Sequence, residues 1–73
     1  MSRSVEISAR NVIKGTVRQV TLGAVNAEIV VEIPGGQEIV SIITISSTKR
    51  LGLEVGKEAY VVVKASNVMI ATD

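Results

Sequence analysis

Apolar and polar side chains alternate along much of the chain, and a period of two residues is typical of β-strands. The clearest alternation spans residues 24–33 and predicts a strand with one apolar face. The apolar positions are Val25, Ala27, Ile29, Val31 and Ile33. Residues 12–20 alternate less regularly, but their β-branched side chains also favour a strand. Gly15 within them predicts a bulge or a close approach of another backbone.

A hairpin and a third strand are predicted next. Pro34-Gly35-Gly36 suits a tight turn, because proline sets φ at the second turn position and glycine permits a positive φ at the third. Residues 37–45 predict a strand whose two faces are both largely apolar. We therefore expect this strand to be covered on both sides, by the chain's own core and by a partner.

The last third of the chain predicts a short helix and two more strands. Residues 46–52 begin with hydroxyl side chains that can cap a helix, then carry two basic residues and end on glycine. Residues 58–64 predict a fourth strand, and residues 68–71 predict a short last one. Evenly spaced strands with one short helix before the penultimate strand predict an all-β fold, a small five-stranded OB-like barrel.

Length and composition point to an oligomer. A chain of 73 residues forms a single domain, 1–73, and a domain this small is only marginally stable by itself. Disulfides, a metal or partner subunits usually add the missing stability. The sequence has no Cys and no His, which removes disulfides, thiolate metal sites and the commonest metal ligand. Because 47% of the residues are hydrophobic, we expect part of the apolar surface to lie between copies of the chain.

Other classes of protein fit the composition poorly. No apolar run approaches the roughly 18 residues of a membrane span, and residues 1–6, expected to be a flexible lead, lack the apolar core of a signal peptide. These features predict a cytoplasmic protein without a membrane partner. The net charge of +1 and the single aromatic residue, Tyr60, argue against nucleic acid, since single-strand binders stack bases on aromatic rings.

Hydroxyl and cationic donors gather at four places, each at a strand end or a helix start. These are Ser8 with Arg10, then Thr44, then Ser46 with Ser47 and Thr48, and finally Lys64 with Ser66. Arg10 offers a planar fork of N–H donors that fits the oxygens of an anion, and Ser8, two residues away in an extended chain, projects to the same face. No carboxylate lies within these clusters. The pattern indicates an oxyanion site, with no site for a bare metal cation.

A plainer interpretation of the same residues stays open. Ser47 can serve only to cap the helix, Lys64 can serve only as a solvated strand end, and Thr44 can be an ordinary strand residue.

The order of the motifs resembles the molbindin (Mop) family of small molybdate-binding proteins. Its module also recurs in molybdate-responsive regulators and molybdate transporter ATPases. The resemblance covers residues 7–71. It rests on Ser8-Ala9-Arg10-Asn11, Lys14-Gly15-Thr16-Val17, Ile43-Thr44 before a serine-rich corner, Leu51-Gly52-Leu53 followed by Val55-Gly56-Lys57, and Lys64-Ala65-Ser66. One departure is the longer lead before Ser8.

The resemblance implies an OB-like barrel that exchanges its N-terminal strand, in a homohexamer built as a trimer of dimers. It implies molybdate or tungstate as the bound ligand, with no organic cofactor, in pockets at subunit interfaces. One subunit would supply Ser8 and Arg10, and a neighbour would supply Thr44, Ser47, Lys64 and the region of Ala65 and Ser66. The implied site also includes Ala9, Asn11 and Ser46. Arg10 and Lys64 would balance the charge of the dianion.

Three alternatives remain beside non-enzymatic molybdate binding for storage or homeostasis. OB-type barrels also serve as protein- or RNA-interaction modules. The chain could act as an accessory domain of a larger assembly, although its Met start and its end just past the last strand favour a free-standing protein. Catalysis fits worst, because without His and Cys the familiar triads and zinc sites are unavailable.

Overall fold

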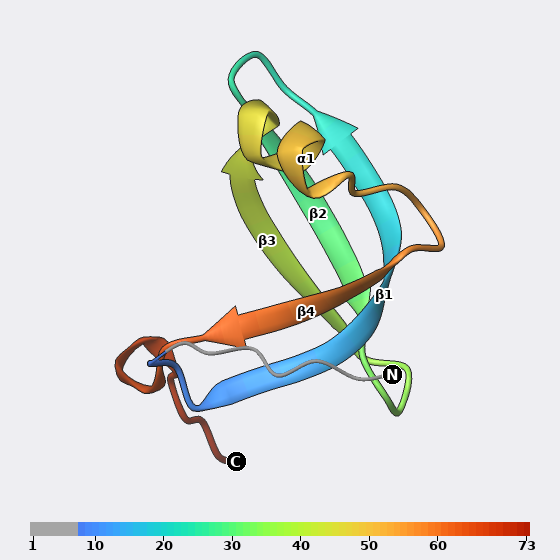
Figure 1. Cartoon of the computed structure of the whole chain (residues 1–73). Helices are drawn as coiled ribbons and strands as arrows, with labels where there is room; N and C mark the ends of the chain where they lie inside the picture. The colour runs from blue at the N-terminus through green and yellow to red at the C-terminus, as the bar shows by residue number, and fades with distance from the viewer. Residues whose placement is uncertain (1–7) are drawn as a thin grey trace.

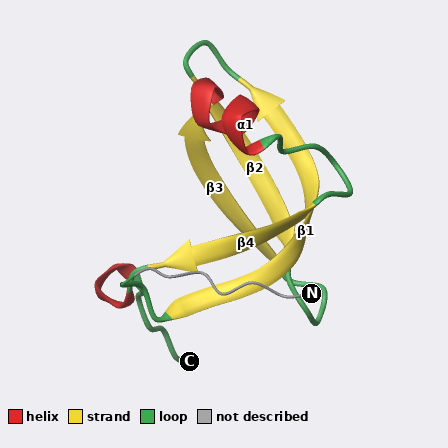
Figure 2. Ribbon diagram, in the orientation of Figure 1, coloured by secondary structure: helices red, strands yellow, loops and turns green. Residues whose placement is uncertain are grey.

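Four antiparallel strands form one strongly curved sheet, in the order β3-β2-β1-β4 (Figure 1). The structure is a computed structural model, and it describes residues 8–73. The strands are β1 (Asn11–Leu22), β2 (Asn26–Glu32), β3 (Glu38–Thr44) and β4 (Glu58–Val63). Between β3 and β4 lies the helix α1 (Ile45–Leu51), and a 3-10 turn, η1 (Ala65–Asn67), follows β4. Figure 2 shows these two short segments as the helical parts of residues 8–73.

The core lies on the concave face of the sheet. Val17, Ala27, Ile29 and Val31 form its buried centre, and apolar residues of β3, β4 and the segment after α1 pack against them. The alternation predicted for β2 is therefore confirmed at three of its positions. It is wrong at Val25, which precedes the strand and is 70% exposed. The chain turns there, with the Gly23 N–H donating to the Asn26 carbonyl at 2.8 Å.

Gly15 allows β1 and β2 to approach closely. A Cβ atom at this position would lie 2.6 Å from the Glu32 carbonyl oxygen and 2.6 Å from Val31 Cγ1. The predicted close approach is thus confirmed. The bulge lies elsewhere: Val17 pairs with Val31 and Gln19 with Val30, so Arg18 is the extra residue. The bulge shifts the alternation, and Val20 returns to the core side.

Local turn chemistry follows the sequence. The Gly36 N–H donates to the Ile33 carbonyl at 3.1 Å, and Gly35 has φ +98°, as expected for a turn with proline second and glycine third. At the end of α1, Gly52 adopts the left-handed conformation with φ +66°, and its N–H donates to the Lys49 carbonyl.

The predicted all-β fold with one short helix is confirmed, whereas a fifth strand and closure of the barrel are not seen in residues 8–73. Within residues 8–73 there are four strands, and β3 and β4 are the two unpaired edges of the sheet. Residues 68–71 are not a strand: after η1 the chain runs away from the sheet (Figure 1), and Met69 is 93% exposed. Between the edges lies an open, mainly apolar hollow of about 490 Å³. The single chain is a half-barrel.

The convex face of β3 carries Val40 and Ile42, which are 58% and 61% exposed. The predicted apolar character of both faces of this strand is therefore confirmed. That a partner covers the convex face stays a prediction. No helix in residues 8–73 is long and apolar enough to cross a membrane. The predicted flexible lead, residues 1–6, and any exchange of the N-terminal strand before Ser8 lie outside the described residues.

Candidate functional site

The first predicted donor cluster forms where β1 begins and β4 ends. Asn11 pairs with Val63 in the strand register, and Asn11 Nδ2 donates to the Val63 carbonyl oxygen at 3.1 Å. Arg10 and Lys64 are the next residues outward from this pair, so both cations lie at the same end of the sheet. Both are exposed, as is Ser8, whereas Ala9 is half-buried. This end of the molecule therefore presents two cations and a hydroxyl to solvent.

Lys64, Ala65 and Ser66 are held by the tight turn after β4. The Asn67 N–H donates to the Lys64 carbonyl at 2.8 Å, and the Val68 N–H donates to the Ala65 carbonyl at 3.3 Å. Because the turn follows directly after Val63, which pairs with Asn11, Ala65 and Ser66 lie at the same end of the sheet as the Ser8–Asn11 segment. We call residues 8–11 and 64–66 together the strand-end cluster.

The second donor cluster forms at the start of α1. Thr44 is the N-cap: its Oγ1 accepts the Ser47 N–H at 3.0 Å, and the same hydroxyl donates to Ser47 Oγ at 3.0 Å. Buried Thr48 donates from its Oγ1 to the Thr44 carbonyl at 3.0 Å. Ser46 is exposed and Ser47 half-buried. We call Thr44, Ser46 and Ser47 the helix-start cluster; its cap is Thr44, whereas capping was expected of Ser47.

The two clusters lie at opposite ends of the curved sheet (Figure 1). Thr44 pairs with Asn26, next to the end of β1 at Leu22, whereas the strand-end cluster adjoins Asn11 at its start. β1 has 12 residues, a contour of roughly 40 Å at about 3.3 Å per residue. One chain therefore does not gather the predicted residues into one pocket.

This separation changes the division of residues that the family resemblance implied. Lys64, Ala65 and Ser66 were expected to join Thr44 and Ser47 from one subunit. In the structure they lie instead with Ser8–Asn11, because the β1–β4 ladder holds the two segments together. Residues of both clusters can therefore meet in one pocket only if they come from different chains.

Arg50 was not among the oxyanion residues predicted from the sequence, but it lies beside the helix-start cluster. Its Nη2 lies 3.5 Å from Ser47 Oγ, at the long limit for a hydrogen bond. Its position could have been inferred from the sequence, because Arg50 follows Ser47 by three residues and residues three apart on a helix are neighbours. The ion pairs among the described residues involve other cations, Lys14 with Glu58 and Arg18 with Glu32.

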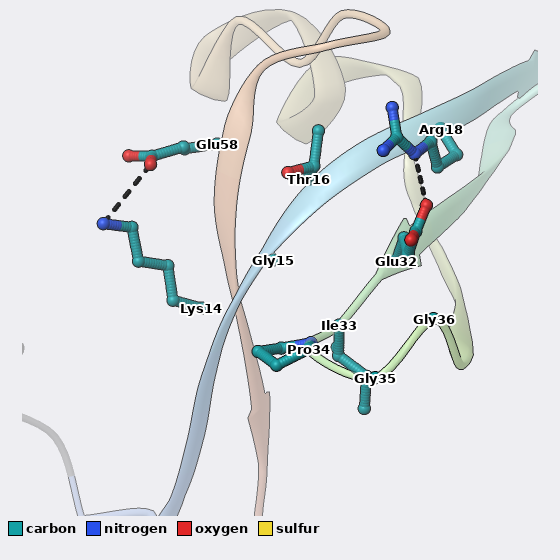
Figure 3. A pocket seen from close by; sticks show the side chains of 10 residues that line it. All are labelled: Lys14, Gly15, Thr16, Arg18, Glu32, Ile33, Pro34, Gly35, Gly36 and Glu58. Carbon is teal, nitrogen blue, oxygen red and sulfur yellow. Dashed lines mark hydrogen bonds and ion pairs between the residues drawn. The ribbon is translucent and has the colours of Figure 1, made fainter.

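A hollow of about 300 Å³ lies where β1 crosses the β2–β3 turn (Figure 3). The two ion pairs line it: Lys14 Nζ lies 3.3 Å from Glu58 Oε2, and Arg18 Nε lies 2.6 Å from Glu32 Oε1. None of the predicted oxyanion residues lines this hollow. Because its two cations are each paired with a carboxylate, this hollow does not suit the binding of an anion.

The chemistry of the two clusters suits an oxyanion. They offer guanidinium, ammonium, hydroxyl and amide groups, which donate hydrogen bonds to a fully deprotonated anion. Carboxylates, which would repel it, are missing from both clusters. Among residues 8–73, no group of three His, Cys, Asp or Glu side chains could hold a metal ion.

Comparison with known proteins agrees with this chemistry. The TOBE domain family matches residues 7–70. A probable molybdenum-pterin-binding protein of Haemophilus influenzae is 44% identical over 68 residues, covering 93% of this chain and 99% of that protein. The relative is named as a binding protein, with no enzymatic activity in its name.

Solved structures share the fold. MopII from Clostridium pasteurianum superimposes with a TM-score of 0.86 at 48% identity, covering 92% of this chain and 100% of that chain. The cytoplasmic molybdate-binding protein ModG, with molybdate bound, gives a TM-score of 0.86 at 46% identity, covering 89% of this chain and 46% of that chain. With the family model spanning nearly its whole length, this chain belongs to the TOBE-domain proteins of the molbindin (Mop) family.

Proposed function

We propose that this protein binds molybdate, without catalysis, at sites between subunits, and serves intracellular molybdenum storage or homeostasis. The observation that carries the proposal is the 46% identity to ModG, whose structure holds molybdate, together with a donor set free of carboxylates. The alternative of a protein- or RNA-interaction module has no comparable support.

The site we propose joins the two clusters from different chains. Ser8, Arg10 and Lys64 of one subunit meet Thr44 and Ser47 of another, with Ala9, Asn11, Ser46, Ala65 and Ser66 shaping the pocket. Arg10 and Lys64 balance the two negative charges, while hydroxyls and backbone N–H groups fit the tetrahedral oxygens.

The assembly we propose is a cytoplasmic homohexamer, a trimer of dimers. Its support is the half-barrel, whose two outer strand edges are unpaired within residues 8–73, and the separation of the two clusters within one chain. Exposed apolar residues on β3 and β4 provide surface for such contacts; Val40, Ile42 and Tyr60 are all more than half exposed. Obligate interfaces are typically apolar in this way.

Selectivity should follow size more than charge. Molybdate, tungstate and sulfate are all tetrahedral dianions, so the same donors serve each of them. Sulfate is the smallest and leaves the donors too far from its oxygens. We therefore expect tungstate to compete with molybdate almost equally and sulfate to compete poorly.

Titration calorimetry with molybdate, sulfate and phosphate tests the proposal, on protein whose mass is checked by light scattering. We expect molybdate to bind an oligomer, and Arg10→Ala and Lys64→Ala each to weaken binding strongly. Lys14→Ala is the matched control, since it also removes one exposed cation but leaves both clusters intact. Absence of molybdate heat in the wild-type oligomer, or equal competition by sulfate, contradicts the proposal.

A further inference from the structure

Hydrogen bonds fix the direction in which the hydroxyls of Thr44 and Ser47, in the helix-start cluster, donate their protons. Thr44 Oγ1 accepts the Ser47 N–H and directs its own proton to Ser47 Oγ, both at 3.0 Å. A hydroxyl has one proton to donate and two lone pairs to accept with. Ser47 Oγ accepts from Thr44, so the Ser47 proton is left to donate elsewhere.

The Arg50 guanidinium approaches the same oxygen. Arg50 Nη2 lies 3.5 Å from Ser47 Oγ, at the long limit for a hydrogen bond, so a charged donor faces the remaining lone pair. An oxygen that accepts from two donors, one of them charged, becomes a better proton donor itself, because hydrogen bonds in a chain polarise one another. Ser47 is half-buried and keeps an accessible face, so its proton can reach a ligand outside the chain.

The charge of Arg50 has no carboxylate partner among residues 8–73, where the ion pairs use Lys14 and Arg18. The first turn of α1 also carries no acidic residue. The guanidinium has five N–H donors, and Ser47 takes one of them. The others remain available beside the hydroxyl pair.

We infer that Arg50 is a further binding residue of the oxyanion site, supplying a third cation and orienting the Ser47 hydroxyl toward the anion. The inference rests on the proposed function and adds a residue to that site. Arg50 then offsets part of the anion's negative charge from the side of the helix-start cluster, which supplies hydroxyls but no other cation.

Two single substitutions in α1 separate this role from a general loss of charge. Arg50→Ala and Lys49→Ala each remove one exposed cation from the last turn of the same helix. Of these two cations, Arg50 is the one that approaches Ser47. We expect Arg50→Ala to weaken molybdate binding about tenfold, on the order of one charge contact with a dianion near the surface. Lys49→Ala should weaken it less than about twofold, since surface charges at longer range are screened.

A double-mutant cycle tests whether Arg50 acts with Ser47. Ser47→Ala removes the shared oxygen, so Arg50→Ala should have a smaller effect in the Ser47→Ala background than in the wild type. Arg50→Lys should restore part of the affinity, because it returns the charge without the fork that reaches Ser47. The fall of log K with log salt should also become shallower for Arg50→Ala than for Lys49→Ala.

The results distinguish failure of this inference from failure of the function. If Arg10→Ala abolishes molybdate binding while Arg50→Ala and Lys49→Ala behave alike, the function stands and the role of Arg50 is overturned. If the wild-type oligomer takes up no molybdate, both fail together. Thermal unfolding of the ligand-free variants checks the fold, and we expect Arg50→Ala and Lys49→Ala to unfold within a degree or two of each other.

Discussion

Asn11 and Val63 face each other across β1 and β4, and Asn11 Nδ2 donates to the Val63 carbonyl oxygen at 3.1 Å. The bond joins residues 52 positions apart in the sequence. It fixes the point where the two strands separate, just before Arg10 on one side and Lys64 on the other. An amide side chain thus joins the two strand ends that carry the cations.

Asn11→Ala should loosen this end of the sheet. Loss of one half-buried hydrogen bond to a carbonyl lowers the free energy of unfolding by about 1 kcal/mol. Urea denaturation measures the change, and molybdate titration should show weaker binding because Arg10 and Lys64 lose their fixed spacing. Asn67→Ala serves as the control: Asn67 is exposed, and its side chain makes no hydrogen bond among the described residues. Equal stability of Asn11→Ala and Asn67→Ala would contradict this role for Asn11.

Gly15→Ala should destabilise the fold through crowding. The added Cβ meets the Glu32 carbonyl oxygen and Val31 Cγ1, each 2.6 Å away, and the first is backbone that cannot move aside easily. We expect a loss of about 1–3 kcal/mol in the free energy of unfolding. Adding Gly15→Ala to a Val31→Ala background should cost less than adding it to the wild type, because one of the two clashes is gone. Strict additivity of the two changes would argue against the clash with Val31.

Thr44 caps α1 and belongs to the proposed molybdate site. Two substitutions distinguish the effect of its hydroxyl from the effect of its side-chain size. Thr44→Val keeps the shape but removes the oxygen that caps Ser47 N–H, so we expect a loss of about 1 kcal/mol in stability and weaker molybdate binding. Thr44→Ser keeps the hydroxyl and should lose only a few tenths of a kcal/mol. Chemical denaturation and calorimetry on both variants provide the comparison. Identical stability of the two variants would show that the cap contributes nothing.

The convex face of β3 should be covered in the assembled protein. Ile42→Asp places a charge on a side chain that is 61% exposed in the single chain, where it should be tolerated. If copies of the chain cover that face, the charge reduces the mass measured by light scattering and lowers the thermal midpoint at low protein concentration. Gln37→Asp, an exposed position beside the β2–β3 turn, is the control. An unchanged mass for Ile42→Asp means that this face is not an interface.

The exposed ion pair between Lys14 and Glu58 should contribute little to the free energy of unfolding. Lys14 and Glu58 are 58% and 69% exposed in their side chains, and such pairs are worth less than about 1 kcal/mol. Glu58→Gln should therefore leave the free energy of unfolding nearly unchanged in moderate salt. A loss as large as that of Gly15→Ala would show that the pair is part of a buried contact in the assembly.

Much of the fold was determined by local sequence. The alternation from Ala27 to Val31 defined the buried face of β2, Pro34-Gly35 defined the turn, and Gly52 ended the helix. Each of these depends on neighbours along the chain, through side-chain period or backbone φ, so the sequence alone sufficed. The bulge could not be placed in this way, because Arg18 is extra only relative to its partner strand β2.

The residues of the site we propose came from the sequence, and their distribution over the molecule came from the tertiary structure. Arg10, Lys64, Thr44 and Ser47 were identified by their chemistry and by resemblance to a family. Only the β1–β4 ladder decided that Lys64 lies with Arg10, at the opposite end of the sheet from Thr44. Residues far apart in sequence are brought together by strand register, which depends on long-range hydrogen bonds and core packing. Within residues 8–73, the same register leaves the outer edges of β3 and β4 unpaired, so the four described strands form a half-barrel.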